Sequence, residues 1–354
     1  MQRINNNIKI EFYSQKNEKE YNNFILNKPN STIYHTLEWK QILEKKFGYN
    51  TFYLIVKDSE GRIGAILPLF LVNNVLGKRL QSIPHSSYSE AIGEEKYINF
   101  LIKKAIELKE ELNCKFLLMR GDPTLFDNII KYFNISKFEP FRRQNVKIVN
   151  PLTMWNNLHK NNRTSIRKGK KNNLQIEIAT KENELKEFYY LYSLTNTRLG
   201  LSPFSYSFFL DIWRKMYPKG MIKVFIVRYD GRAISSTLNF PFKNTLYSAY
   251  IGWDITKKSL KPNNYLDWYS ILWCYKKGYK YFDFGLTYKE DKSLFSYKSS
   301  FNTTTSPYAK YVFPKNINYS GPQILLKKIG RKIISKTPLC INSRLGMVLN
   351  KYLT

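Results

Sequence analysis

Two stretches of the chain repeat one pattern of apolar and polar positions. In the first stretch, helical spacing alternates with runs typical of strands, and Gly48 ends the opening helix. The pattern predicts a helix, three strands, a second helix and a closing strand, at residues 36–47, 52–57, 63–72, 80–83, 94–112 and 115–119. The polar segment 58–62 (DSEGR) predicts the turn between the first two strands.

The second stretch returns to this order after residue 184. It predicts two helices, three strands, a helix and a closing strand, at 184–199, 206–216, 222–228, 233–240, 246–252, 264–277 and 281–284. The turn at 230–232 (DGR) matches the earlier one. We interpret the pattern as an internal duplication, the alternative being two unrelated α/β stretches that share a common hairpin turn.

A strand meander followed by a helix and another strand resembles the GNAT acyltransferase fold, whereas a doubly wound fold would alternate strands and helices strictly. We therefore expect an α/β (α+β) protein of two tandem GNAT-like units with mixed sheets, plus a C-terminal basic helical tail. The expected boundaries are 1–150, 151–315 and 316–354.

A basic helix is predicted at 155–171, between the two units. Its cations Lys160, Arg163, Arg167 and Lys171 recur at helical spacing on one side. Another side carries Trp155, His159, Asn162 and Ile166. Clustered cations on one face suit phosphate or a tRNA backbone. A solvated surface helix is the alternative.

The tail shows the pattern of a basic amphipathic helix. Leu325, Ile329 and Ile333 stand four residues apart, and cations occupy the positions between them. Such a helix can lie on an anionic membrane. A terminal helix packed on the body of the protein would show the same periodicity.

The balance of charge narrows the classes of partner. Lys and Arg number 57 against 27 Asp and Glu, a formal charge of +30, which attracts nucleic acid, anionic membrane or phosphorylated substrates. The three cysteines and three histidines are scattered, so we predict no disulfide framework, no metal site and no cofactor. The polar N-terminus predicts no secretory signal, and the longest apolar stretch, 63–72, is too short to span a bilayer. We expect a cytoplasmic protein, with contact at the inner membrane face as an option.

An acetyl-CoA enzyme of the GNAT type needs a pyrophosphate loop, R/Q-x-x-G-x-G/A, at a helix N-terminus. Neither unit contains such a loop, and the glycines Gly220, Gly231, Gly252 and Gly285 are isolated. The sequence thus disfavours CoA as the acyl donor.

One group of motifs resembles the FemXAB aminoacyltransferases. Asp283-Phe284-Gly285, followed by LFSYKSSFN at 294–302, is similar to that family's D-x-G and F-K-x-x-F ending. The resemblance extends over about 33–314 through HTLEW (35–39), RGDP (120–123), RLGL (198–201), YIG (250–252) and LKPNNYLDW (260–268).

The resemblance implies transfer of an amino acid from aminoacyl-tRNA to an amine of a nucleotide-linked or lipid-linked envelope precursor. It implies that Lys298 stabilises the charge that develops on the ester carbonyl and that Asp122 accepts the amine proton. Substrate contacts are expected from Arg120, Arg163, Arg167, Tyr206 and Tyr297, the last at a position where the family often has Phe.

Simpler interpretations stand beside these roles. Lys298 is one of many lysines, Asp122 can cap the turn before Pro123, and Tyr206 can be a packing residue. The family's lysine four residues after the opening tryptophan is Leu43, so an acceptor other than a UDP-muropeptide stays open. The rival functions are a CoA-dependent GNAT N-acyltransferase and a non-catalytic protein that binds nucleic acid or membrane.

Overall fold

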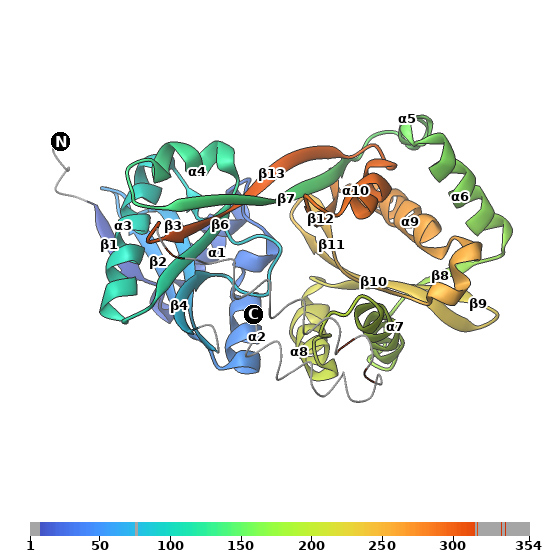
Figure 1. The fold of residues 1–354 in the computed structure, drawn as a ribbon, viewed down its shortest axis with the longest axis horizontal. Helices are drawn as coiled ribbons and strands as arrows, with labels where there is room; N and C mark the ends of the chain where they lie inside the picture. Colours follow the sequence, from blue (N-terminus) through green and yellow to red (C-terminus); the bar gives the residue numbers. More distant parts are fainter. Residues whose placement is uncertain (1–7, 75–76, 316, 318–333, 335–336, 338–354) are drawn as a thin grey trace. The chain divides into compact units, whose positions relative to one another are not determined.

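The computed structural model describes residues 8–74 and 77–315, together with the single residues 317, 334 and 337 (Figure 1). The described chain forms two compact units. Of the described residues, the first comprises those up to Pro140 and those from Pro307 to Ile317, and the second comprises Phe141–Ser306 with Ile334 and Thr337. The predicted membrane helix around Leu325, Ile329 and Ile333 lies outside the described residues.

The first unit is a mixed sheet with strand order β1-β2-β3-β4-β6-β13, and β5 pairs with β3. Neighbouring strands run antiparallel except β4 and β6, which are parallel. The elements are β1 (Lys9–Phe12), α1 (Glu18–Asn27), α2 (Leu37–Phe47), β2 (Asn50–Lys57), β3 (Ile63–Asn74), β4 (Gly77–Ser82), β5 (Ile92–Gly93), α3 (Glu95–Glu111), β6 (Phe116–Gly121), α4 (Pro123–Ile130) and β13 (Thr304–Phe313). Strand β7 (Ser136–Lys147) begins in this unit and continues into the second from Phe141.

Local signals account for the predicted elements of this unit. The Thr36 side chain accepts a hydrogen bond from Trp39 N at the start of α2, and Gly48 ends the helix in the left-handed region at φ 69°. The apolar face of α3 packs against the strands through Ile98, Leu101, Ile102, Ala105 and Leu108. These helices and strands therefore form where the hydrophobic pattern places them.

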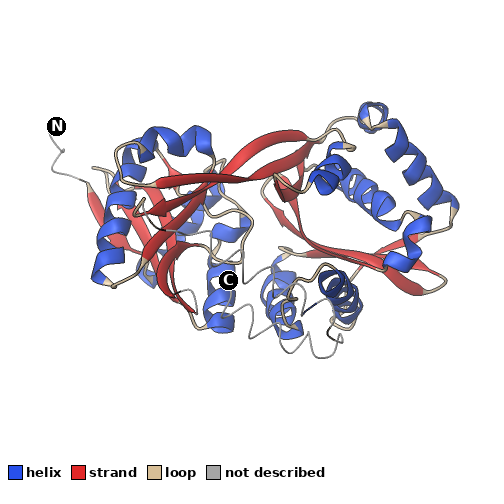
Figure 2. Cartoon of the chain, viewed as in Figure 1, coloured by secondary structure: helices blue, strands red, loops and turns tan. Residues whose placement is uncertain are grey.

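The second unit repeats this arrangement with strand order β7-β12-β11-β10-β9-β8. Figure 2 shows helices on both faces of its sheet. Helices α7 and α8 cover one face of its sheet, and α6 and α9 lie on the other (Figure 1). The elements are α5 (Pro151–Asn157), α6 (Lys160–Lys171), β8 (Gln175–Ile178), α7 (Glu184–Arg198), α8 (Tyr206–Met216), β9 (Lys223–Tyr229), β10 (Arg232–Phe242), β11 (Thr245–Trp253), η4 (Ile255–Leu260), α9 (Pro262–Lys276), β12 (Tyr281–Tyr288) and α10 (Lys292–Ser299).

The two units share one topology. In each, an edge strand and two helices precede an antiparallel meander, then a helix, a parallel strand, a short helix and a last strand. The last strand of the first series, β7, pairs with β12 of the second unit, and the last strand of the second series, β13, pairs with β6 of the first. This common order confirms the predicted pair of GNAT-like units and adds an exchange of their final strands.

The predicted single helix at 155–171 is wrong in one respect, because the chain forms two helices there. Leu158 is buried with an extended backbone (ψ 144°), which ends α5. The ring nitrogen Nδ1 of His159 then accepts a hydrogen bond from Asn161 N at 3.3 Å and caps α6. Trp155 consequently belongs to α5, while Asn162 and Ile166, which were predicted to share one side of the helix, lie on the buried side of α6.

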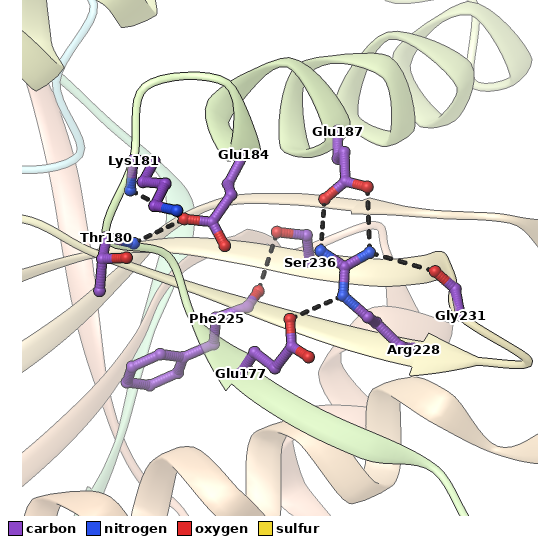
Figure 3. A network of polar contacts seen from close by, with 9 residues as sticks. All are labelled: Glu177, Thr180, Lys181, Glu184, Glu187, Phe225, Arg228, Gly231 and Ser236. Atoms are coloured by element: carbon purple, nitrogen blue, oxygen red, sulfur yellow. Dashed lines mark hydrogen bonds and ion pairs between the residues drawn. The ribbon is translucent and has the colours of Figure 1, made fainter.

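An arginine ties three elements of the second unit together (Figure 3). Arg228 on β9 donates from Nε to Glu177 on β8 at 2.7 Å and from Nη2 to Glu187 on α7 at 2.7 Å. At the start of α7, Glu184 accepts from the backbone N–H groups of Thr180 and Lys181, both at 2.8 Å. These contacts fix α7 on the sheet edge.

Candidate active site

In the second unit, the neighbouring strands β11 and β12 pair over only part of their length. The two parallel strands pair only over Thr245–Tyr247 and Tyr281–Asp283. Beyond that point β11 has a register shift opposite Leu238 and Asn239, and β12 has one after Asp283, where Gly285 takes a left-handed φ of 73°. The Asp283-Phe284-Gly285 motif therefore lies where two neighbouring strands diverge.

Asp283 holds this turn in place. Its side chain is almost fully buried. Its Oδ1 accepts from Gly285 N at 2.6 Å, and its Oδ2 accepts from Arg143 Nε on β7 at 3.0 Å. These contacts are those of a structural hydrogen-bonding residue.

Lys298, the predicted catalytic lysine, lies in the last turn of α10 and is 5% exposed. Its ammonium donates to the backbone carbonyl oxygen of Leu286 at 3.2 Å, and no other described residue accepts a hydrogen bond from it. Burial lowers the pKa of Lys298 to about 8, against the opposing charges of Asp283, Asp267 and Asp291. Two of its three N–H donors are thus free for an acceptor that the described residues do not supply.

A second buried acid, Asp267 on α9, belongs to the same cluster and was not predicted. Its Oδ2 accepts from the hydroxyl of Tyr297 at 2.7 Å. Burial raises the pKa of Asp267 to about 7, and the Tyr297 hydrogen bond and the Lys298 charge partly oppose this rise. A carboxylate within the apolar run 265–274 (YLDWYSILWC) is the sequence signal that could have identified it.

A buried glutamine fixes the helix that carries Lys298. Gln144 on β7 donates from Nε2 to Phe295 O at 3.2 Å, Ser299 Oγ at 3.1 Å and Thr303 Oγ1 at 3.2 Å. Its Oε1 accepts from the Thr287 hydroxyl at 3.1 Å. These contacts join β7 and β12 to α10 and to the residues that follow it, and they restrain the backbone of the turn that contains Lys298.

The other predicted catalytic residue, Asp122, is part of the first unit. It caps α4, where its Oδ1 accepts from Thr124 N at 2.9 Å and from the Thr124 hydroxyl at 2.8 Å. Nearby, Arg120 donates to Ser89 Oγ at 3.0 Å and to Ile83 O at 2.9 Å, which secures the loop after β4. Both side chains have structural partners, and their predicted roles at a substrate stay predictions.

The remaining predicted substrate contacts lie in the second unit. Tyr206 starts α8, and its buried hydroxyl has no hydrogen-bond partner among the residues that the structure describes. An unsatisfied buried hydroxyl is costly, so a ligand or water is the expected partner. Arg163 donates to the carbonyl oxygens of Asn156 and Leu158 at the end of α5. Arg167 lies over the Trp155 ring, 5.3 Å from its centroid.

Helix α6 packs directly on the start of α9. Asn264 donates to Asn162 Oδ1 at 2.9 Å, and Asn172 donates to Leu260 O at 3.3 Å. Gly169 allows the close approach, because a Cβ there would lie 2.7 Å from the Cβ of Tyr265. The exposed side of α6 is basic and contains no acid, with Lys160, Arg167, Lys168, Lys170 and Lys171 exposed.

The arrangement supplies a cation where charge can develop. An ammonium held in a dry site, with unused donors and a rigid backbone, can stabilise an oxyanion without reorganising. The structure brings Lys298, Tyr297, Asp267 and Asp283 together within one unit. It places Asp122 and Arg120 in the other.

Comparisons with known proteins agree with this geometry. Residues 156–299 match a family model described as an acetyltransferase (GNAT) domain. No curated protein matches the sequence. Among solved structures, FemX is similar with a TM-score of 0.69 and 15% identity, over 91% of this chain and 100% of FemX.

Two further structures share the fold. A tandem GNAT protein from the clavulanic acid biosynthesis pathway has a TM-score of 0.56 and 8% identity, over 86% of this chain and 98% of that one. L-PGS from Bacillus licheniformis has a TM-score of 0.54 and 11% identity, over 85% and 97%. The FemX-like fold of two GNAT units is thus confirmed, and the GNAT domain identifies the chain as an acyltransferase.

Proposed function

We propose that this acyltransferase moves an aminoacyl group from aminoacyl-tRNA to an amine of a cell-wall or other envelope precursor. In this reaction the amine nitrogen forms a bond to the ester carbonyl carbon, and the bond from that carbon to the ribose oxygen breaks. The amine loses a proton, and the ribose oxygen gains one. The observation that carries the proposal is the buried ammonium of Lys298 in its motif.

Lys298 is assigned to the carbonyl oxygen of the ester. Negative charge appears on that oxygen only as the amine attacks, so a fixed ammonium there stabilises the transition state more than the bound substrate. Asp122 stays the proposed proton acceptor by resemblance. Tyr206, with its unsatisfied hydroxyl, and Tyr297 and Arg120 remain proposed contacts to the substrates.

The surroundings of α9 support a donor other than acetyl-CoA. A GNAT enzyme would hold the CoA pyrophosphate on backbone N–H groups before this helix. Here α6 packs against the start of α9 through Asn162 and Gly169. In addition, Pro262 lacks a backbone N–H, so the first turn of α9 has one donor fewer. The loop before it contains no glycine.

The basic side of α6 supports an RNA donor. Its exposed cations are joined by Lys257, Lys258 and Lys261 of the adjacent loop, which Asn172 ties to α6 through Leu260. Arg163 and Arg167 belong to the same helix. Cations clustered on one side of a helix suit a phosphate backbone.

The acceptor and the cellular location follow from the same resemblance. FemX and L-PGS share the fold, and we propose a nucleotide-linked or lipid-linked amine as acceptor, reached in the cytoplasm at the inner membrane face. Among the residues described, no helix has both the length and the apolar character to cross a bilayer.

The decisive experiment supplies the purified protein with tRNA charged with radiolabelled amino acids and with envelope precursors from bacterial membranes and cytosol. Label should enter an envelope precursor with wild-type protein and not with Lys298→Met. A parallel reaction replaces charged tRNA with labelled acetyl-CoA. Transfer from acetyl-CoA and none from tRNA would contradict the proposal.

A further inference from the structure

The buried cluster around Lys298 contains an acid whose purpose the proposed reaction does not explain. Asp267 is 3% exposed and lies on α9, thirty residues in sequence from Tyr297. The hydroxyl of Tyr297 is the sole group among the described residues that donates to its carboxylate. A carboxylate can accept about four hydrogen bonds, so one bond leaves it poorly compensated for its burial.

The other charges near Lys298 are already matched or exposed. Asp283 on β12 has Arg143 and Gly285 N as partners. Asp291 lies in front of α10, is exposed, and caps that helix through Leu294 N at 3.0 Å. Three described carboxylates carry charge that affects Lys298, and Asp267 is the buried one among them without a cation bonded to it.

The ring of Tyr297 fixes where its hydroxyl points. It packs edge-on against Phe301, with ring centroids 5.6 Å apart, and Phe301 packs on Phe284 of β12 at 5.2 Å. Tyr297 directly precedes Lys298 in the last turn of α10. A bond from Tyr297 to Asp267 thus anchors the turn that presents the ammonium and holds a negative charge beside it.

We propose that Asp267 is a positioning residue that acts through Tyr297 to hold Lys298 in place and in its charged form. A negative charge at Asp267 favours the ammonium over the neutral amine, and losing it favours the amine. The Tyr297 hydroxyl bonds to the charged oxygen and thereby favours the ionised carboxylate against the effect of burial.

The test reads the protonation of Lys298 without any substrate. Trace acetic anhydride acetylates neutral amines, so the acetylation of the Lys298 peptide, followed by mass spectrometry from pH 6 to 10, reports the pH at which the ammonium loses its proton. We expect a midpoint near 8 in the wild type. We expect Asp267→Asn to move the midpoint down by about half a pH unit or more, and Tyr297→Phe to move it down by less.

Two controls isolate the effect. The peptide containing Lys292, exposed on the same helix, should be acetylated to the same extent in every variant at each pH. Tyr269→Phe removes a hydroxyl from α9 two residues from Asp267 and should leave Lys298 unchanged. The double variant Asp267→Asn/Tyr297→Phe should match Asp267→Asn alone, because Tyr297 acts through Asp267.

The outcomes separate this inference from the proposed function on which it rests. If both single variants leave the Lys298 midpoint in place or raise it, Asp267 is not a positioning residue, whatever the enzyme transfers. If the midpoint falls as expected but no aminoacyl transfer is found, the inference stands and the proposed reaction fails. Should Asp267→Asn not fold, Tyr297→Phe, which keeps the ring packing, decides the question alone.

Discussion

The buried ammonium of Lys298 donates a hydrogen bond to the backbone carbonyl oxygen of Leu286 at 3.2 Å, and it donates none to a described carboxylate. Because a carbonyl oxygen carries only a partial charge, this hydrogen bond offsets little of the free energy that is needed to remove the ammonium from water. The lowered pKa of Lys298 expresses the same cost. The protein thus keeps a destabilising group at the point where its two central strands diverge.

Replacing Lys298 with Met should therefore raise stability while it lowers activity. We expect turnover to fall about a hundred-fold or more, as for the loss of one oxyanion donor. The free energy of unfolding should rise by roughly 2 kcal/mol at pH 7, because the burial cost exceeds the lost hydrogen bond. Urea unfolding and single-turnover assays measure the two effects.

The pH dependence of this gain has a defined sign. The pKa of Lys298 in the folded protein, about 8, lies below the usual 10.5. Lys298 therefore does not destabilise the wild type above pH 10.5, where it is neutral in both states, and the free energy of unfolding decreases as the pH falls from 10.5 through 8. The advantage of Lys298→Met should be largest below pH 8 and shrink toward pH 10. Lys292→Met, at an exposed position, should change neither property, and a destabilised Lys298→Met would contradict the assignment.

Asp122 offers a way to separate capping from proton transfer. Asn caps a helix as well as Asp, so Asp122→Asn should keep the melting temperature of the wild type, whereas Asp122→Ala should lose about 1 kcal/mol. If Asp122 accepts the amine proton, Asp122→Asn should slow turnover at least ten-fold despite its intact fold. Full activity in Asp122→Asn would leave Asp122 as a cap.

The cations of α6 should govern how tRNA binding responds to salt. Lys168→Gln/Lys171→Gln should weaken binding of uncharged tRNA and reduce the slope of log affinity against log salt by about 1 to 2. Filter binding from 50 to 300 mM salt measures it. Lys103→Gln, at an exposed position on α3 in the other unit, is the matched control and should keep the wild-type slope.

Gly169 should tolerate no side chain. Its Cβ would lie 2.7 Å from the Cβ of Tyr265 and 3.3 Å from Lys261 O, so Gly169→Ala should push α6 away from α9 and cost about 1 to 3 kcal/mol. Thermal unfolding checks this. Thr164→Ala, at an exposed position of the same helix, should be neutral, and equal stability of the two variants would show that the contact is loose.

Arg228 should resist conservative replacement. A lysine cannot reach Glu177 and Glu187 together with the geometry of a guanidinium, so Arg228→Lys should cost about 1 kcal/mol in urea unfolding. Arg214→Lys changes a more exposed pair with Glu182 and should stay within about 0.5 kcal/mol. Similar losses in both variants would argue against a special role of the Arg228 network.

Local patterns were enough to predict most helices and strands of the two units. Gly48 and the apolar face of α3 are short-range signals, and the structure follows them. The partners of β7 and β13 could not be predicted in this way, because strand pairing between β13 and β6 joins residues nearly two hundred positions apart. The break at Leu158 was missed since a single residue changes from helical to extended backbone there.

The candidate site was predicted through its motif and not through its environment. Lys298 was identified by the residues around it in sequence, while its burial and its contact with Leu286 depend on the turn at Gly285. Asp267 was missed because burial of an acid is decided by tertiary packing, which periodicity within α9 does not reveal. The motifs thus gave Lys298 a role, whereas Asp267, although it lies within the motif at 260–268, was given none.

The exchange of final strands has a consequence for how the chain is made. Domains emerging from a ribosome usually fold one after another from the N-terminus. Here the first unit lacks β13, the neighbour of β6, until residues 309–313 have been synthesised, by which time all of Phe141–Ser306 is already available. The unit whose synthesis begins first is therefore completed last. The edge of β6 stays without its partner strand β13 until the whole unit that contains Lys298 has been synthesised.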